Sequence, residues 1–199
     1  MREIDTRQST QTPQIEDTAQ PTKTPFPFMY LTISAAVILI DQITKYIARY
    51  YLECDFIPHL RCPQFHSVSV IGDFFKLTIV YNQKAAFSMG FASEGINRIF
   101  FSVMAFAMVL FVVYMLKIAT RKVEKIAFAL IIGGAIGNLS DRIIHGAVTD
   151  FLDFDWPNWL YFERWPTFNI ADSSIVCAAI MLLIYIMFFE KKYRQEQKK

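Results

Sequence analysis

Two aspartates of this chain, Asp150 and Asp172, lie at the ends of two long apolar stretches. Asp150 directly follows one stretch and Asp172 lies in the first turn of the next, so their carboxyl groups are expected at the same end of two successive helices. Two carboxyl groups held close together cannot both stay ionised, and they share one proton. One can then act as a base on a water molecule while the other, protonated, polarises a peptide carbonyl. The pair therefore predicts the chemistry of an aspartic peptidase, which requires no metal and no cofactor.

Asp172 also has a second interpretation. Asn169 could cap the helix, with Asp172 as the third helical residue that satisfies free backbone amides. The two interpretations are compatible, because the N-terminus of a helix stabilises a negative carboxylate. We therefore expect Asp172 to be the more readily ionised member of the pair and Asp150 to carry the shared proton.

Charged residues also interrupt the first apolar stretch. At the centre of a spanning helix each such residue costs about 2.5–3.5 kcal/mol. Asp41 and Lys45 are four residues apart, so they share one helix face and can pair. They could form a structural ion pair that holds this helix against its neighbours, or they could support the aspartate pair.

The third apolar stretch ends in a glycine-rich run followed by several polar residues. The glycines allow another backbone to approach closely. Asn138, Asp141 and Arg142 follow at positions i, i+3 and i+4, which predicts that they share one helix face. Arg142 is a candidate to hold a substrate carbonyl or a developing negative charge, because its guanidinium carries a fixed fork of donors. Alternatively, Arg142 only pairs with Asp141 or Asp41. Asn138 could bind the substrate backbone or orient the carboxylates, and Asn169 has the same two alternatives.

Four apolar stretches must position these residues. Of the 199 residues, 54% are hydrophobic and 19% are charged, whereas a soluble domain usually has about 25% charged residues. A helix needs about 20 mostly apolar residues to cross a bilayer. The stretches expected to do so are residues 28–51, 96–116, 123–146 and 170–189. The chain is therefore predicted to be a membrane all-α protein with four transmembrane helices.

A small β-sheet subdomain is expected outside the membrane, within residues 52–95. From Phe75 to Tyr81 the side chains alternate with a period of two, which is typical of a β-strand. Cys54 and Cys62 lie in the same segment, and they either form a disulfide or remain two separate thiols. Cys177 lies in an apolar helix and is expected to contribute to packing only.

The flanking charges predict the orientation in the membrane. Lys and Arg concentrate on the cytoplasmic side, and here they are dense between the second and third stretches and after the fourth. Both termini are therefore expected in the cytoplasm, with the aspartate pair on the outer face. Residues 1–26 are predicted to be a disordered tail, residues 27–190 the membrane domain and residues 191–199 a basic cytoplasmic tail. The net charge of +2 gives no argument for nucleic-acid binding, and we expect a monomer.

Five blocks of this sequence, taken in order, resemble the lipoprotein signal peptidase (signal peptidase II) family of membrane aspartic peptidases. The blocks are Asp41-x-x-x-Lys45, Asn82-Gln83-Lys84-Ala85-Ala86-Phe87-Ser88, Gly133-Gly134-Ala135-x-Gly137-Asn138-x-x-Asp141-Arg142, Gly146-x-Val148-x-Asp150-Phe151 and Phe168-Asn169-x-Ala171-Asp172. The resemblance implies that Asp150 and Asp172 are the catalytic residues. It implies a supporting or substrate-binding role for Asp41, Lys45, Asn82, Asn138, Asp141, Arg142 and Asn169.

The resemblance also implies a substrate and a location. The substrate would be a bacterial prolipoprotein that carries diacylglycerol on a cysteine, and the cut just before this cysteine would release the signal peptide. The enzyme would lie in the inner membrane among lipids and would be inhibited by globomycin. Lys84 departs from the family, which has Gly there. This lysine could place a cation near the carboxylates or a lipid phosphate, or it could point to solvent.

Two other classes of function stay open on the sequence alone. A proton-coupled transporter could use Asp41, Lys45 and Asp141 as a relay. Carriers, however, usually place such groups near the midplane between repeated halves, and this chain has no evident repeat. A structural or assembly factor is the other class, but it would not need two aspartates at matched helix ends.

Overall fold

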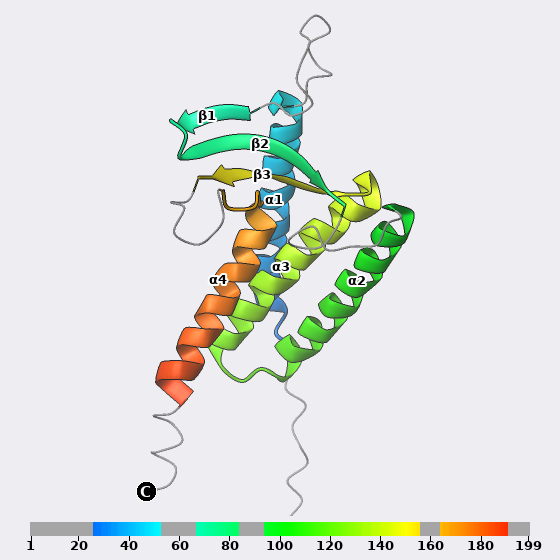
Figure 1. Cartoon of the computed structure of the whole chain (residues 1–199). Coiled ribbons are helices and arrows are strands. Elements are labelled where there is room, and N and C mark those ends of the chain that lie inside the picture. The colour runs from blue at the N-terminus through cyan, green and yellow to red at the C-terminus, as the bar shows by residue number, and fades with distance from the viewer. Residues whose placement is uncertain (1–25, 53–66, 84–93, 156–163, 191–199) are drawn as a thin grey trace, which may run out of the picture.

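The computed structural model describes residues 26–52, 67–83, 94–155 and 164–190. Several features predicted from the sequence lie outside these ranges: both terminal tails, Cys54 and Cys62, and Lys84. The described residues form helices and one small sheet (Figure 1).

Four helices of the described residues are long and apolar enough to cross a membrane. They are α1 (Leu31–Leu52), preceded by a short 3-10 turn (Phe28–Tyr30), α2 (Glu94–Ile118), α3 (Lys122–His145) and α4 (Ile170–Tyr185), which continues as a π-helical segment (Ile186–Glu190). In Figure 1, α3 lies between α2 and α4, with α1 behind, and the sheet covers one end of the helices. The predicted fold class, four membrane helices with a small sheet, is confirmed.

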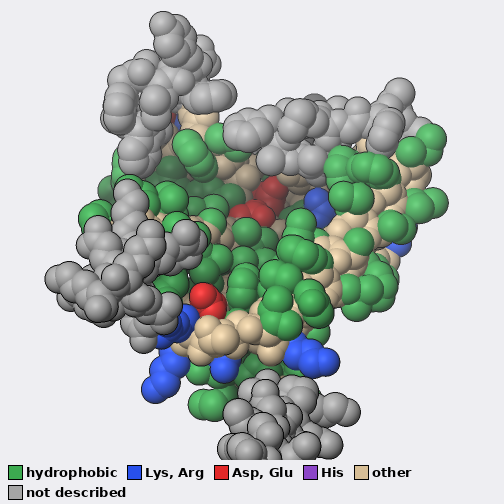
Figure 2. Space-filling view, turned by 90° about the horizontal axis from the view of Figure 1, so that it is seen from below, with side chains coloured by type: hydrophobic (Ala, Val, Ile, Leu, Met, Phe, Trp, Pro, Cys, Tyr) green, Lys and Arg blue, Asp and Glu red, His purple; other side chains and the backbone are tan. Residues whose placement is uncertain are grey.

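The outer surfaces of the helices are apolar. On α2, for example, Val112 and Leu116 are buried against α3, whereas Ile99, Val103 and Phe106 are exposed. Hydrophobic side chains cover most of the face seen in Figure 2, and acidic side chains are recessed among them. Monomeric soluble proteins rarely expose apolar patches of this extent, so these surfaces fit contact with lipid.

Glycines on α3 allow the neighbouring helices to come unusually close. A Cβ atom added to Gly134 would lie 2.5 Å from the carbonyl oxygen of Ala171 on α4, and one added to Gly137 would lie 2.6 Å from an Asp41 carboxyl oxygen on α1. Real Cβ atoms do not approach so closely, so a side chain at Gly134 would push α4 away, and one at Gly137 would displace the Asp41 carboxyl group. The close approach expected from the glycine-rich run therefore brings both α1 and α4 against α3.

The sheet contains three antiparallel strands in the order β1-β2-β3. They are β1 (Ser67–Ile71), β2 (Phe75–Asn82) and β3 (Val148–Phe154). Only β2 was predicted from the sequence. Strand β3 begins where α3 has ended at Gly146, whose positive φ of 81° closes the helix. Because β3 pairs with β2, it carries Asp150 opposite Val80.

The inner side of the sheet packs on the end of α1. Ile79 of β2 and Phe151 of β3 form a buried cluster with Ala48 and Leu52 of α1. On β3, the buried Phe151 anchors the strand next to the aspartate that precedes it. The sheet is therefore fixed to the helices at the same end at which α4 begins.

Candidate active site

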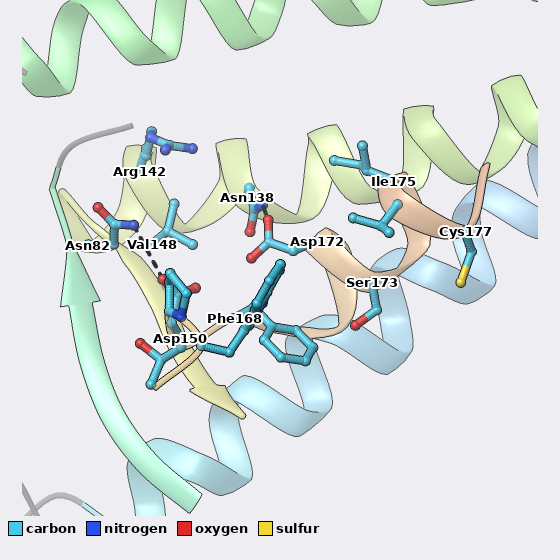
Figure 3. Close-up of a pocket in the computed structure, with 14 residues that line it drawn as sticks. Asn82, Asn138, Arg142, Val148, Asp150, Phe168, Asp172, Ser173, Ile175 and Cys177 are labelled. Atoms are coloured by element: carbon cyan, nitrogen blue, oxygen red, sulfur yellow. Dashed lines mark hydrogen bonds between the residues drawn. The ribbon is translucent and has the colours of Figure 1, made fainter. Parts of the chain in front are cut away.

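Asp150 and Asp172 line one cavity of about 540 Å³ at the junction of the sheet and the helices. A volume of this size is typical of sites that bind small molecules or peptide segments. Figure 3 shows Asp150 on β3, Asp172 on α4, and Asn138 and Arg142 on α3. Asn82, at the end of β2, also lines the cavity. The structure thus gathers residues from four of the five sequence blocks around one space.

Asp150 is almost completely buried, with 3% of its surface exposed. Its Oδ1 accepts a hydrogen bond of 2.7 Å from the side-chain amide of Asn169, and its Oδ2 accepts a longer one of 3.4 Å from Asn82. Burial and the nearby charge of Asp172 raise the pKa of Asp150 to about 7, although both hydrogen bonds act in the opposite direction. Asp150 is therefore suited to carry a proton near neutral pH.

Asp172 is held in the first turn of α4 by a capping box. The Asn169 side chain accepts a hydrogen bond from the Asp172 backbone N–H at 2.9 Å, and Asp172 Oδ2 accepts one from the Asn169 N–H at 3.3 Å. The capping interpretation is thus confirmed, and it coexists with the place of Asp172 on the cavity wall. Asp172 Oδ1 accepts a third hydrogen bond of 2.7 Å from Asn138.

Two asparagine amides connect the two carboxyl groups. The Asn169 amide nitrogen donates to Asp150 and also lies 3.1 Å from the Asn138 side-chain oxygen. That oxygen accepts from Lys45 as well, at 2.9 Å, so the Asn138 amide nitrogen is directed at Asp172. Of the two alternatives for these asparagines, the contacts favour orientation of the carboxylates.

A charged cluster lies behind this chain of amides. Lys45 Nζ is 2.9 Å from an Asp41 carboxyl oxygen and 3.3 Å from one of Asp141, and all three side chains are 0% exposed. Asp41 also accepts a hydrogen bond of 2.9 Å from the backbone N–H of Ala171, and Asp141 accepts one of 2.8 Å from that of Thr149. The predicted Asp41–Lys45 pair is therefore real, and the cluster holds the segments that carry both Asp172 and Asp150.

Asn138, Asp141 and Arg142 lie within an arc of about 100° on α3, as their spacing predicts, but this arc faces two different neighbours. Asp141 points to Lys45, whereas Asn138 and Arg142 line the cavity. Successive residues of an α-helix are rotated by about 100°, so positions i+3 and i+4 lie on opposite sides of position i. Asp141 and Arg142 consequently diverge, and only Asn138 lies between the cluster and the cavity.

Arg142 has no ion pair with Asp141 or Asp41 in the described parts of the chain. Its guanidinium lies 6.0 Å from the centre of the Phe101 ring on α2, and the residue borders the cavity. The alternative in which Arg142 only pairs with an aspartate is therefore not observed. Arg142 therefore borders the cavity without an ion pair to either aspartate in the described parts of the chain.

Sequence reasoning missed two residues behind the site, Arg49 and Thr149. Arg49 Nη1 donates a hydrogen bond of 2.7 Å to the Thr149 hydroxyl and lies 3.7 Å from Asp141. The signal was present in the spacing, because Arg49 is four residues after Lys45 and so continues the same face of α1.

The raised pKa of Asp150 predicts that the folded protein loses stability as the pH rises. The folded pKa of about 7 lies above the ordinary value of 3.8, so this contribution is complete below a pH of about 4 and is lost as the pH passes through about 7. In detergent, the thermal unfolding midpoint of the wild type should fall across this interval. The Asp150→Asn protein, which cannot ionise at this position, should show a smaller fall.

The Asp172→Asn variant supplies a control for this prediction. The charge of Asp172 contributes to the raised pKa of Asp150, so its removal should move the fall in stability to lower pH. Equal pH dependence of the midpoint in the wild type and in Asp150→Asn would show that Asp150 does not titrate in this range.

Comparisons with known proteins agree with the geometry. The model of the family described as signal peptidase (SPase) II matches residues 33–188. A lipoprotein signal peptidase of Janthinobacterium sp. (strain Marseille) is 41% identical over 158 residues, which cover 78% of this chain and 86% of the relative. One from Francisella tularensis subsp. novicida (strain U112) is 37% identical over 166 residues, which cover 82% and 94% respectively.

Two solved structures have the same fold. Both are described as bacterial membrane enzyme structures obtained by the in meso method, one at 2.3 Å and one at 1.9 Å resolution. The first matches with a TM-score of 0.64 at 27% identity and covers 83% of this chain and 91% of its own. The second matches with a TM-score of 0.62 at 27% identity and covers 85% and 99%.

Proposed function

Since the chain belongs to the signal peptidase II family, whose members are aspartic peptidases, we propose that it removes signal peptides from bacterial prolipoproteins that carry diacylglycerol on a cysteine, by a cut just before this cysteine. The observation that carries the proposal is the shared cavity of Asp150 and Asp172, in which Asn169 hydrogen-bonds to both residues. Membership of a peptidase family also favours this function over the proton-coupled transporter.

The proposed reaction uses the two aspartates in different protonation states. Asp172, at a helix N-terminus with amide donors around it, begins as the carboxylate. Asp150, with a pKa of about 7, begins protonated. Asp172 takes a proton from a water molecule, whose oxygen attacks the carbonyl carbon, while Asp150 stabilises the carbonyl oxygen. When the C–N bond breaks, the proton that Asp172 took from water passes to the amine nitrogen of the cysteine, and Asp150 keeps its own proton. Water has then been added across the peptide bond.

Arg142 is proposed to hold the substrate near these groups. It lines the cavity without an aspartate partner among the described residues, and a guanidinium offers several donors to carbonyl oxygens. Asn82, which reaches Asp150 from β2, is proposed to help orient this carboxyl group. Asp41, Lys45 and Asp141 support the site from behind and do not line the cavity.

The position of the cavity fits a lipid-modified substrate. Its polar residues lie where the sheet meets the helices, and its wall continues along α4 through Ile175, Val176 and Cys177. A scissile bond near the lipid headgroups could therefore reach the aspartates while an apolar chain lies along α4. For Cys177, the packing role expected from the sequence is not observed, because the side chain is exposed and borders the cavity.

The proposed location is the bacterial inner membrane, with both termini in the cytoplasm and the cavity on the outer face. In support, the α2–α3 connection, with Lys117, Arg121 and Lys122, lies at the opposite end of the helices from the sheet (Figure 1). Basic residues of short connections favour the cytoplasmic side. We also propose that the enzyme acts as a monomer and is inhibited by globomycin.

Cleavage of a defined precursor tests this function. Purified protein should convert a diacylglyceryl-modified precursor into a product that begins with the lipidated cysteine, as identified by mass spectrometry. Globomycin should inhibit the conversion. The same precursor without lipid should be cut at least about 100-fold more slowly, because remote binding energy is lost from the transition state. Equal cleavage of both precursors, or a cut at another bond, would contradict the proposal.

A further inference from the structure

Arg49 and Thr149 form a contact that the sequence blocks do not include. Arg49 lies in the last turn of α1, and Thr149 is the β3 residue directly before Asp150. The two side chains are joined by the 2.7 Å hydrogen bond from Arg49 Nη1 to the Thr149 hydroxyl. Neither residue lines the cavity, so neither is placed to touch a substrate.

Thr149 is held at each of its polar groups. Its backbone N–H donates to Asp141 at 2.8 Å, its carbonyl oxygen accepts from the Asn169 side chain at 3.3 Å, and its hydroxyl accepts from Arg49. The residue is completely buried, with 0% of its surface exposed. These three contacts come from α3, from the cap of α4 and from α1, so Thr149 is the point at which three helices fix the strand.

The position of Thr149 determines the position of the Asp150 carboxyl group. Successive side chains of a strand point to opposite faces, so Asp150 faces the cavity while Thr149 faces the helix ends. The Thr149 carbonyl carbon is bonded to the Asp150 nitrogen. A rotation of Thr149 would therefore displace the Asp150 carboxyl group from Asn169, which now holds it at 2.7 Å.

We propose that Arg49 is a positioning residue for catalysis, which acts on Asp150 by fixing the Thr149 hydroxyl. This inference rests on the proposed function, because it concerns the same reaction. A displacement of about 1 Å in a reacting group can lower a rate about 100-fold. Loss of the Arg49 contact should therefore slow the chemical step, which lowers kcat, and should leave substrate binding in the cavity largely unchanged.

Matched substitutions at Thr149 separate the hydroxyl from the shape of the side chain. Thr149→Val keeps the branched shape and removes the acceptor, whereas Thr149→Ser keeps the acceptor. We expect kcat on the lipidated precursor to fall about 10-fold or more in Thr149→Val with KM within about two-fold of the wild type. Thr149→Ser should recover most of this loss.

Substitutions at Arg49 test the other end of the contact. Arg49→Leu should lower kcat by a similar factor, and Arg49→Lys, which still offers a donor, should recover part of it. Arg49→Leu also removes the guanidinium that lies 3.7 Å from Asp141, but Asp141 keeps its contacts with Lys45 and with the Thr149 backbone in both variants. Since both residues act through one hydrogen bond, the double variant Arg49→Leu/Thr149→Val should be no more than about two-fold slower than the slower single variant.

Three results would overturn the inference while the wild type cleaves the precursor. The first is an unchanged kcat in Thr149→Val, and the second is an equal loss of kcat in Thr149→Ser and Thr149→Val. The third is a loss of kcat in the double variant that equals the product of the losses in the two single variants. If Arg49→Leu does not fold, the two Thr149 variants decide the question alone. A wild-type protein that fails to cleave the lipidated precursor would instead refute the proposed function, so the two failures are distinguishable.

Discussion

Replacement of Asp150 or Asp172 by asparagine is expected to lower the rate of cleavage of a diacylglyceryl-modified precursor by at least about 1,000-fold. Asparagine has nearly the shape of aspartate, but it can neither take a proton from water nor give one to the leaving amine. Each aspartate has a separate task in the proposed reaction, so neither can replace the other. The measurement is the initial rate at saturating precursor, with the unfolding midpoint recorded for each protein.

The double variant Asp150→Asn/Asp172→Asn tests whether the aspartates act as one unit. Residues that cooperate in one step show non-additive losses, so this protein should be about as slow as the slower single variant. The Asp150→Asn protein should also be at least as stable as the wild type at pH 8, because a buried charge has been removed. A single variant that folds and retains more than about a tenth of the wild-type rate would eliminate the dyad assignment.

The contacts of Asn169 and Asn138 explain why replacing either aspartate should lower the cleavage rate more than replacing another residue that lines the cavity. Both carboxyl groups accept hydrogen bonds from fixed amides, and the Asn138 amide is itself oriented by Lys45. These hydrogen bonds hold both carboxyl groups in place. They supply no proton, however, so their loss should reduce the rate without abolishing the chemistry.

Much of this architecture was predictable because membrane helices obey a simple length and polarity rule. Each of the four helices needs its own apolar stretch, and the stretches can be read directly from the sequence. The same apolar stretches predicted that Asp150 and Asp172 lie close together, because the end of one membrane helix and the start of the next must lie at the same membrane face.

Strand β3 and the divergence of Asp141 from Arg142 were not predicted, and the reasons are physical. The strand is stabilised by pairing with β2, whose residue Asn82 is 68 positions away from Asp150. Such a distant partner leaves no local signal. The spacing of Asp141 and Arg142 was read as one face because both are near Asn138, although a rotation of about 100° separates them. The packing of α1 against α3 places Lys45 beside Asp141, and Arg142 is left to face the cavity.

The charged cluster behind the site gives the largest expected effect on stability, in the variant Lys45→Met. Methionine fills a similar volume, but it leaves the Asp41 and Asp141 carboxylates, which are 0% exposed, without the cation between them. Breaking a buried ion pair by removing one partner usually costs about 3–5 kcal/mol. We therefore expect a large drop in the unfolding midpoint in detergent, and a loss of cleavage that follows the loss of folded protein.

Two comparisons distinguish this charge effect from a general intolerance of the fold. Lys76→Met removes the cation of an ion pair whose partner, Asp73, is exposed, so its midpoint should change little. The triple variant Asp41→Asn/Lys45→Met/Asp141→Asn neutralises the whole cluster, and its asparagine oxygens can still accept from the backbone of Ala171 and Thr149. Replacing all the buried charges costs less than leaving some unpaired, so the triple variant should be more stable than Lys45→Met. A triple variant that is less stable than Lys45→Met would show that the net attraction within the cluster exceeds the cost of burying its charges. The support that the cluster gives to Asp150 and Asp172 would then depend on charge and not on hydrogen bonds alone.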